Sequence, residues 1–216
     1  MVKRALLIGV GAVAALVIAG CGSGDDGRDT SASQSQDHGS SATSSTASAN
    51  AADHNDADAM FAQHMIPHHQ QAVEMSDIVL AKQGVDPRVT QLATQIKAAQ
   101  GPEIKQMQDW LSQWGNPPMP PMGADEGHGS HGGGGMSGAA MGMMSDEQLT
   151  ALKNASGVEA NRLFLTGMIA HHEGAIEMAQ TEIDGGTFAP AIDMAREIAK
   201  TQQAEIDTMK GILETL

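Results

Sequence analysis

Two stretches decide the fold: His64–Met75 is HMIPHHQQAVEM, and Gly167–Met178 is GMIAHHEGAIEM. Each places two adjacent histidines in an apolar pattern with residues at i, i+3, i+4 and i+7, which is typical of an amphipathic helix. A buried imidazole without a partner costs free energy, so such histidines need either polar neighbours or a ligand. The doubled motif therefore predicts two equivalent helices that share a site.

The repetition extends to a second helical segment after each motif. Gln100 and Glu103 lie on the apolar stripe of the first copy, and Gln202 and Glu205 lie on that of the second. Turn signals at 84–87 and 184–190 separate the helices within each copy. Two hairpins that each expose one apolar face can bury both by stacking. We therefore predict an all-α fold, a four-helix bundle built from two repeated helical hairpins with a long Met/Gly-rich crossover loop.

The segment between the hairpins is too rich in Gly and Pro for a long helix. Ser145 with Gln148, and Ser156 with Glu159, have capping-box spacing, which predicts a short helix before the third long one. Methionines in a Gly-rich segment have no core to pack into, so packing does not explain their presence. We therefore expect that residues of this loop bind a soft cation weakly, and the alternative is that the loop is a passive linker. These loop candidates are Met119, Met122, His128, His131, Met136, Met141, Met143 and Met144.

The N-terminus has the pattern of a secretory signal. Lys3 and Arg4 precede an apolar run that is shorter than the roughly 20 residues of a spanning helix. Small residues directly before Cys21 resemble the lipobox of bacterial lipoproteins, which implies a lipid anchor at Cys21 on the outside of the cytoplasmic membrane. An ordinary cleaved signal and an uncleaved anchor are the alternatives. The expected organisation is a signal peptide (1–20), a disordered Ser/Ala/Gly-rich tether (21–55) and a helical domain (56–216) with hairpin 1 (56–115), the connection (116–144) and hairpin 2 (145–216).

Composition limits the chemistry. The formal net charge of −14 repels nucleic-acid phosphates, so we exclude nucleic acid as a partner. Cys21 is the only cysteine, so no disulfide can form within the chain and no further thiolate can bind metal. The chain has 15 methionines, three phenylalanines and no tyrosine, and soft-metal chemistry would fall to methionine and histidine.

A turn of 100° per residue places the motif side chains around each helix. His69 and His172 lie in the middle of their stripes, so we expect them close together at the bundle centre, with Glu103 and Glu205 in hydrogen-bonding reach as orienting groups or as ligands. Glu74 points outward. The candidate metal ligands are His68, His69, His171, His172, Met65, Met168, Met75 and Met178, of which Met75 and Met178 can equally be core residues. Further candidates, as supporting groups or alternative ligands, are Glu103, Glu205, Gln100, Gln202 and His64.

The motifs MIPHHQQAVEM and MIAHHEGAIEM, each followed by Gln-x-x-Glu-Ile, resemble the bacterial family "domain of unknown function 305". The resemblance covers roughly residues 56–216. It implies a ferritin-like four-helix bundle that is exported and that, in some members, binds copper in connection with copper tolerance. It implies no general enzymatic activity. His64 is paired with Gly167 in the repeat, so a fully symmetric site does not follow from the motif.

The function we expect is that of an extracytoplasmic copper-binding lipoprotein, not an enzyme. It would bind Cu(I) or Cu(II) through His and Met ligands for buffering, tolerance or delivery to a copper-acceptor protein. A ferritin-like di-metal oxidase is the first alternative, but such sites use Glu-x-x-His motifs and the chain contains none. The second alternative is a helical interaction module without metal at the membrane surface.

Overall fold

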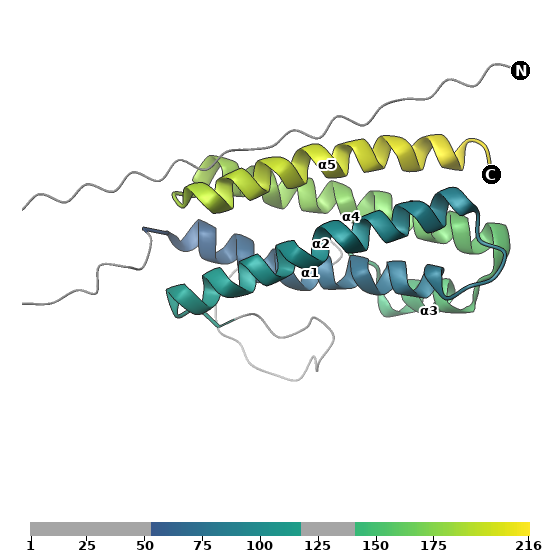
Figure 1. The fold of residues 1–216 in the computed structure, drawn as a ribbon, viewed down its shortest axis with the longest axis horizontal. Coiled ribbons are helices and arrows are strands. Elements are labelled where there is room, and N and C mark those ends of the chain that lie inside the picture. The colour runs from purple at the N-terminus through teal and green to yellow at the C-terminus, as the bar shows by residue number, and fades with distance from the viewer. Residues whose placement is uncertain (1–52, 118–140) are drawn as a thin grey trace, which may run out of the picture. The chain divides into compact units, whose positions relative to one another are not determined.

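The computed structural model describes residues 53–117 and 141–216, which form four long helices, one short helix and no strand (Figure 1). The helices pair as two hairpins, α1 with α2 and α4 with α5, and the hairpins meet mainly through α1 and α4. This confirms the predicted all-α bundle. The helices are α1 (Asp56–Leu80), α2 (Pro87–Trp114), α3 (Asp146–Asn154), α4 (Gly157–Gly185) and α5 (Ala189–Leu213).

A capping box begins α1 and also links it to the second hairpin. The Asn55 side chain accepts hydrogen bonds from the backbone N–H of Ala57 and Asp58, and the Asp58 carboxylate accepts one from the Asn55 N–H at 2.7 Å. The same carboxylate accepts from the backbone N–H groups of Thr187 (3.2 Å) and Phe188 (2.9 Å) in the turn between α4 and α5. One buried side chain thus holds the start of α1 against the far hairpin.

The two predicted capping boxes on hairpin 2 have different outcomes. Ser145 and Gln148 cap α3 reciprocally, as predicted. The prediction for Ser156 and Glu159 is wrong, because Ser156 makes no side-chain capping bond. Gly157 follows with φ of +53°, and this left-handed conformation turns the chain into α4 without the hydroxyl.

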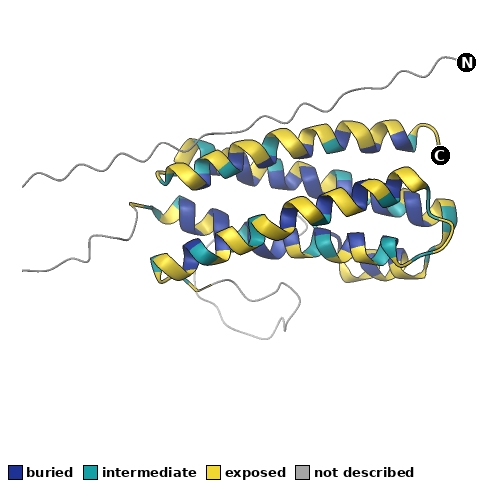
Figure 2. Ribbon diagram, in the orientation of Figure 1, coloured by how far each residue is buried: buried dark blue, intermediate teal, exposed yellow. Residues whose placement is uncertain are grey.

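The buried residues form two apolar clusters, on the inward faces in Figure 2. The first takes residues from the C-terminal half of α1 and α5 and the N-terminal half of α2 and α4, such as Val79, Leu92, Phe164 and Ile206. The second takes the opposite halves, together with Trp110. Between the clusters, each long helix carries polar residues of the doubled motif, which therefore form one layer across the bundle.

The segment Met141–Met144 belongs to this core, which corrects one expectation about the connection. Met141 is 2% exposed and Met144 is 8% exposed. Gly142, with φ of +73°, and Gly174 let the segment approach α4, because a Cβ on Gly174 would lie 1.8 Å from the Met141 carbonyl oxygen. Gln71 holds it from the other side by bonding both the N–H (2.8 Å) and the carbonyl (2.9 Å) of Met144.

Met141 and Met144 therefore do have a packing reason to be present, and Met143 is partly buried against the second cluster. The remaining loop candidates, Met119, Met122, His128, His131 and Met136, lie outside the described residues, as do Cys21 and residues 1–52. The three described tether residues, 53–55, end in the α1 cap. No described helix combines the length and the apolar character needed to cross a membrane.

Candidate metal centre

The polar layer between the two clusters contains the predicted histidines and their partners. All four imidazoles are 0% exposed, and the Gln100 and Gln202 side chains are 3% exposed. Each long helix contributes two residues, because the motif repeats in both hairpins. The layer consists of His68 and His69 (α1), Gln100 and Glu103 (α2), His171 and His172 (α4), and Gln202 and Glu205 (α5).

Two histidines are oriented by carboxylates, as predicted. His69 Nε2 lies 2.8 Å from Glu103 Oε2, and His172 Nε2 lies 2.7 Å from Glu205 Oε2. A carboxylate accepts hydrogen bonds, so each Nε2 carries a proton, and in the neutral form of the ring the lone pair then lies on Nδ1. A metal-binding imidazole is commonly oriented in this way by a carboxylate on its other nitrogen.

The other two histidines form the contact between the hairpins. The rings of His68 and His171 have centroids 3.6 Å apart and planes at 37°. We expected His69 and His172 to make this contact. The difference arises because α1 and α4 face each other through His68 and His171, while the next residue, 100° around each helix, turns toward the carboxylate of its own hairpin.

Burial keeps this central pair neutral. Burial lowers the pKa of His68 to about 3, helped by His69 and His172 and opposed by the hydrogen bond that His68 Nε2–H donates to the Met141 carbonyl at 2.9 Å. Burial also lowers the pKa of His171 well below its usual value. Both rings therefore hold a free lone pair at neutral pH, which is the form that binds metal.

The layer leaves many polar atoms without partners among the described residues. The Nδ1 atoms of His68, His69 and His172 and both ring nitrogens of His171 have no hydrogen bond, nor do the Gln100 amide atoms and Gln202 Oε1. A buried unsatisfied polar group costs about 1–3 kcal/mol. Such a layer is a poor way to stabilise a bundle, and its lone pairs match what a borderline or soft cation requires.

Thioethers flank the layer on both sides. The second cluster contains Met65, Met141 and Met178, and the first contains Met75, Met144 and Met168. Within residues 53–117 and 141–216, no three His, Cys, Asp or Glu side chains are grouped as a metal cage. Imidazoles and thioethers thus lie next to each other at the layer, beside the two carboxylates, and this combination of imidazole and thioether suits Cu(I) or Ag(I) better than a hard cation.

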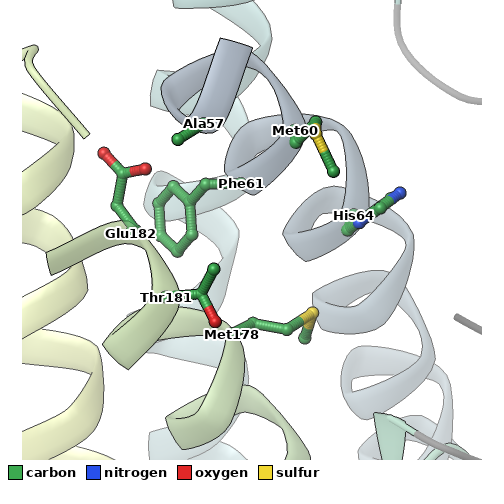
Figure 3. Close-up of a pocket in the computed structure, with 7 residues that line it drawn as sticks. All are labelled: Ala57, Met60, Phe61, His64, Met178, Thr181 and Glu182. Carbon is green, nitrogen blue, oxygen red and sulfur yellow. The ribbon is translucent and has the colours of Figure 1, made fainter. Parts of the chain in front are cut away.

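His64 does not join the layer. It is half-buried and lines a surface pocket of about 130 Å3 with Met60, Phe61 and Met178 (Figure 3). Burial lowers the pKa of His64. Met60 was not among the residues predicted from the sequence, although its position four residues before His64 puts both on one helix face.

Glu182, which lines the same pocket and is 1% exposed, was not predicted from the sequence either. The sequence could have indicated its burial, because Glu182 follows Ala175 by seven residues and therefore lies on the apolar stripe of α4. No donor among the described residues reaches either carboxylate oxygen. Burial, and then the neighbouring Asp58, raises the pKa of Glu182 to about 8. For Asp58, burial acts to raise the pKa, but the hydrogen bonds from the Asn55 backbone, the protonated Glu182 side chain and the backbone of residues 188 and 187 outweigh it, and the pKa is lowered.

Glu182 is expected to make the protein less stable as pH rises. In the unfolded chain this group loses its proton near its usual pKa of 4.5, but the folded protein retains it to about pH 8. The folded state binds more protons in this window, so the stability that Glu182 contributes is lost as pH rises from about 4.5 through about 8. Urea unfolding across this range should show a smaller decline for Glu182→Gln than for the wild type. Parallel pH profiles of the two proteins would contradict this assignment.

Solved structures similar to this chain include copper-bound proteins. CopM in the Cu(I)-bound form is 29% identical, with a TM-score of 0.57 over 73% of this chain and 96% of CopM. CopM in the Cu(II)-bound form is 32% identical, with a TM-score of 0.58 over the same shares of the two chains.

Two further structures are DUF305 proteins. A fragment from Deinococcus radiodurans is 31% identical, with a TM-score of 0.64 over 75% of this chain and 98% of the fragment. A Streptomyces coelicolor protein, described as secreted, is 32% identical, with a TM-score of 0.63 over 74% of this chain and 91% of that protein. No curated protein matches the chain. The sequence profile described as "Domain of unknown function (DUF305)" matches residues 58–213, and the chain therefore belongs to the DUF305 family.

Proposed function

We propose that this protein is an exported copper-binding protein that holds copper as cargo in the polar layer of its bundle. The observation that carries the proposal is the set of unpartnered imidazole nitrogens of His68, His69, His171 and His172, all fully buried. Copper buffering, copper tolerance and copper delivery to an acceptor protein all require a site that binds the ion reversibly. The similarity to CopM, which has been solved with Cu(I) and with Cu(II), supports this proposal.

The donor chemistry favours copper over harder metals. Neutral imidazole suits both oxidation states of copper, and thioether selects Cu(I). Met65 and Met168 are 0% exposed, in different clusters on either side of the layer. A cation bound in the layer, between Met65 and Met168, would bind the imidazole lone pairs that otherwise have no partner. This binding would offset the free-energy cost of burying those polar atoms unsatisfied.

We propose a binding role rather than an enzymatic one. A carboxylate di-metal oxidase would need Glu side chains as ligands. In this bundle Glu103 and Glu205 hydrogen-bond to His69 and His172, the position of orienting groups. The signal pattern before Cys21 and the similarity to a Streptomyces protein described as secreted support export and a lipid anchor in the cell envelope.

Metal analysis of protein purified without an affinity tag tests the proposal. We expect tightly held copper after exposure to Cu(I) under reducing conditions, and none of it lost on gel filtration. Iron or manganese in its place, with oxidase activity, would support the di-metal oxidase. If the purified protein retains no metal, the result would support the remaining alternative, a helical interaction module without metal.

Removing the orienting carboxylates is expected to weaken copper binding without unfolding the bundle. Glu103→Gln and Glu205→Gln keep the side-chain size, but they replace an ionised acceptor with a neutral one. Loss of such a group commonly costs 10–100-fold in metal affinity, so we expect roughly that loss for each variant. Competition against a Cu(I) chelator measures it. Glu177→Gln is the control, because Glu177 is exposed on α4 and lies outside the layer.

A further inference from the structure

The groove between α1 and α4 is covered differently at its two ends. At one end, α3 contacts both α1 and α4, and Met144 packs with Leu149 and Leu152 of α3 in the first cluster. At the other end, the described residues leave the pocket of about 130 Å3 between the first turns of α1 and the last turns of α4. The repeated hairpins thus have unequal ends.

The open end presents soft donors from both helices. Met60 is 51% exposed, one of two large apolar side chains that the described residues leave exposed. His64 has no hydrogen bond with the described residues. Met178 is 8% exposed and enters the pocket from α4, and Figure 3 shows it facing the α1 turns that carry Met60 and His64. Two thioethers and one imidazole therefore line a solvent-accessible hollow.

The repeat lacks these donors at its equivalent place. Leu163 and Gly167 occupy the positions of Met60 and His64 in the second copy of the motif. The Met144 thioether fills the space above Gly167, since its sulfur would lie 2.9 Å from a Cβ there. At the covered end the Met144 side chain fills the place that His64 takes at the open end. The donors of the pocket are therefore specific to the first copy of the motif and do not follow from the repeat.

The pocket also leads to the layer. Met60, His64 and His68 follow each other at intervals of four residues, so they lie on one face of α1 at successive turns. Met178 lies seven residues, or about two turns, beyond His171 on α4. The donors thus form a series from solvent to the His68–His171 contact.

We propose that Met60, His64 and Met178 form a second site, a surface port that binds a soft monovalent cation and passes it to the polar layer. The port binds Cu(I) or Ag(I) because two thioethers and a neutral imidazole match a soft ion of low charge. Its role in loading rests on the proposed function of the layer, whereas its own cation binding does not. Glu182 lines the same pocket and lies beside Phe61 in Figure 3.

Substoichiometric Ag(I) added to protein with 13C-labelled methionine methyl groups tests the site. We expect the Met60 and Met178 methyl signals to shift before those of Met65 and Met168. Met60→Leu and His64→Gln should each weaken this first binding at least about tenfold, which corresponds to losing one ligand. Met194→Leu is the matched control, since Met194 lies on α5 and is partly buried outside the pocket. First shifts elsewhere, or equal binding by Met60→Leu and the control, would overturn the site.

The rate of Cu(I) loading tests the passage. The layer should fill at least about tenfold more slowly in the Met60→Leu variant than in the control, with the same final affinity. Equal loading rates would overturn the port, even if Ag(I) binds in the pocket. Failure of the proposed function is distinct, because the layer would then take no copper in the wild type while Ag(I) still shifted Met60.

Discussion

Replacing all four layer histidines with glutamine is expected to abolish tight copper binding while the bundle stays folded. The variant combines His68→Gln, His69→Gln, His171→Gln and His172→Gln. Glutamine removes the imidazole lone pairs but keeps an N–H donor for Glu103 and Glu205. We expect the Cu(I) affinity to fall by at least about three orders of magnitude, or about 4 kcal/mol. Chelator competition measures the affinity, and circular dichroism verifies the fold.

Two double variants show which pair matters more. His68→Gln with His171→Gln removes the ring contact between the hairpins, while His69→Gln with His172→Gln removes the carboxylate-linked pair. If all four histidines bind one copper ion, the losses in the two double variants should not add up to the loss in the fourfold variant, because ligands of one ion are coupled. Copper affinity unchanged in the fourfold variant would eliminate the layer as the binding site.

Gly174→Ala is expected to be the most destabilising single methyl addition in the bundle. The new Cβ would lie 1.8 Å from the Met141 carbonyl oxygen and 2.4 Å from its carbon, and both belong to backbone. The segment Met141–Met144 must move, which breaks the hydrogen bond from His68 to Met141. Overpacking of this kind costs typically 1–3 kcal/mol, and the lost bond to a buried donor adds about 1–3 kcal/mol more. Urea unfolding measures the change.

Gly211→Ala provides a matched control for this variant. Gly211 lies inside α5 on its exposed side, and a Cβ there meets nothing within 4 Å. Alanine is better than glycine in an exposed helix by roughly 0.5–1 kcal/mol, so this variant should gain stability. If Gly174→Ala is as stable as the wild type, the segment is held less tightly than its contacts with Gly174 and Gln71 indicate.

Much of the architecture could be predicted because it depends on local periodicity. The apolar stripes and the turn residues near 84–87 and 184–190 gave both hairpins, and the inward position of Glu103 and Glu205 gave their bonds to His69 and His172. Each inference needed only the direction of a side chain on its own helix. The identity of the fold class followed from stacking two such hairpins.

The errors arose where two distant elements meet. The ring contact between His68 and His171 depends on how α1 and α4 are rotated against each other, which a single helix does not specify. The burial of Met141 and Met144 depends on Gly174, about 30 residues later, allowing backbone to approach α4. The glycine content of the connection indicated an exposed loop. Local composition does not show whether a distant helix surface can pack against that loop and bury it.

The Asp58 carboxylate also defines how far the N-terminus can be shortened. Four hydrogen bonds converge on it, from the Asn55 N–H, the Thr187 N–H and hydroxyl, and the Phe188 N–H. A protease that released the helical domain by cutting after Asp58 would leave the last three donors without their acceptor, and would also remove the α1 cap. A shortened form that keeps this cap must therefore begin at or before Asn55, and one that also keeps the stacking of His54 on Trp114 must begin at or before His54.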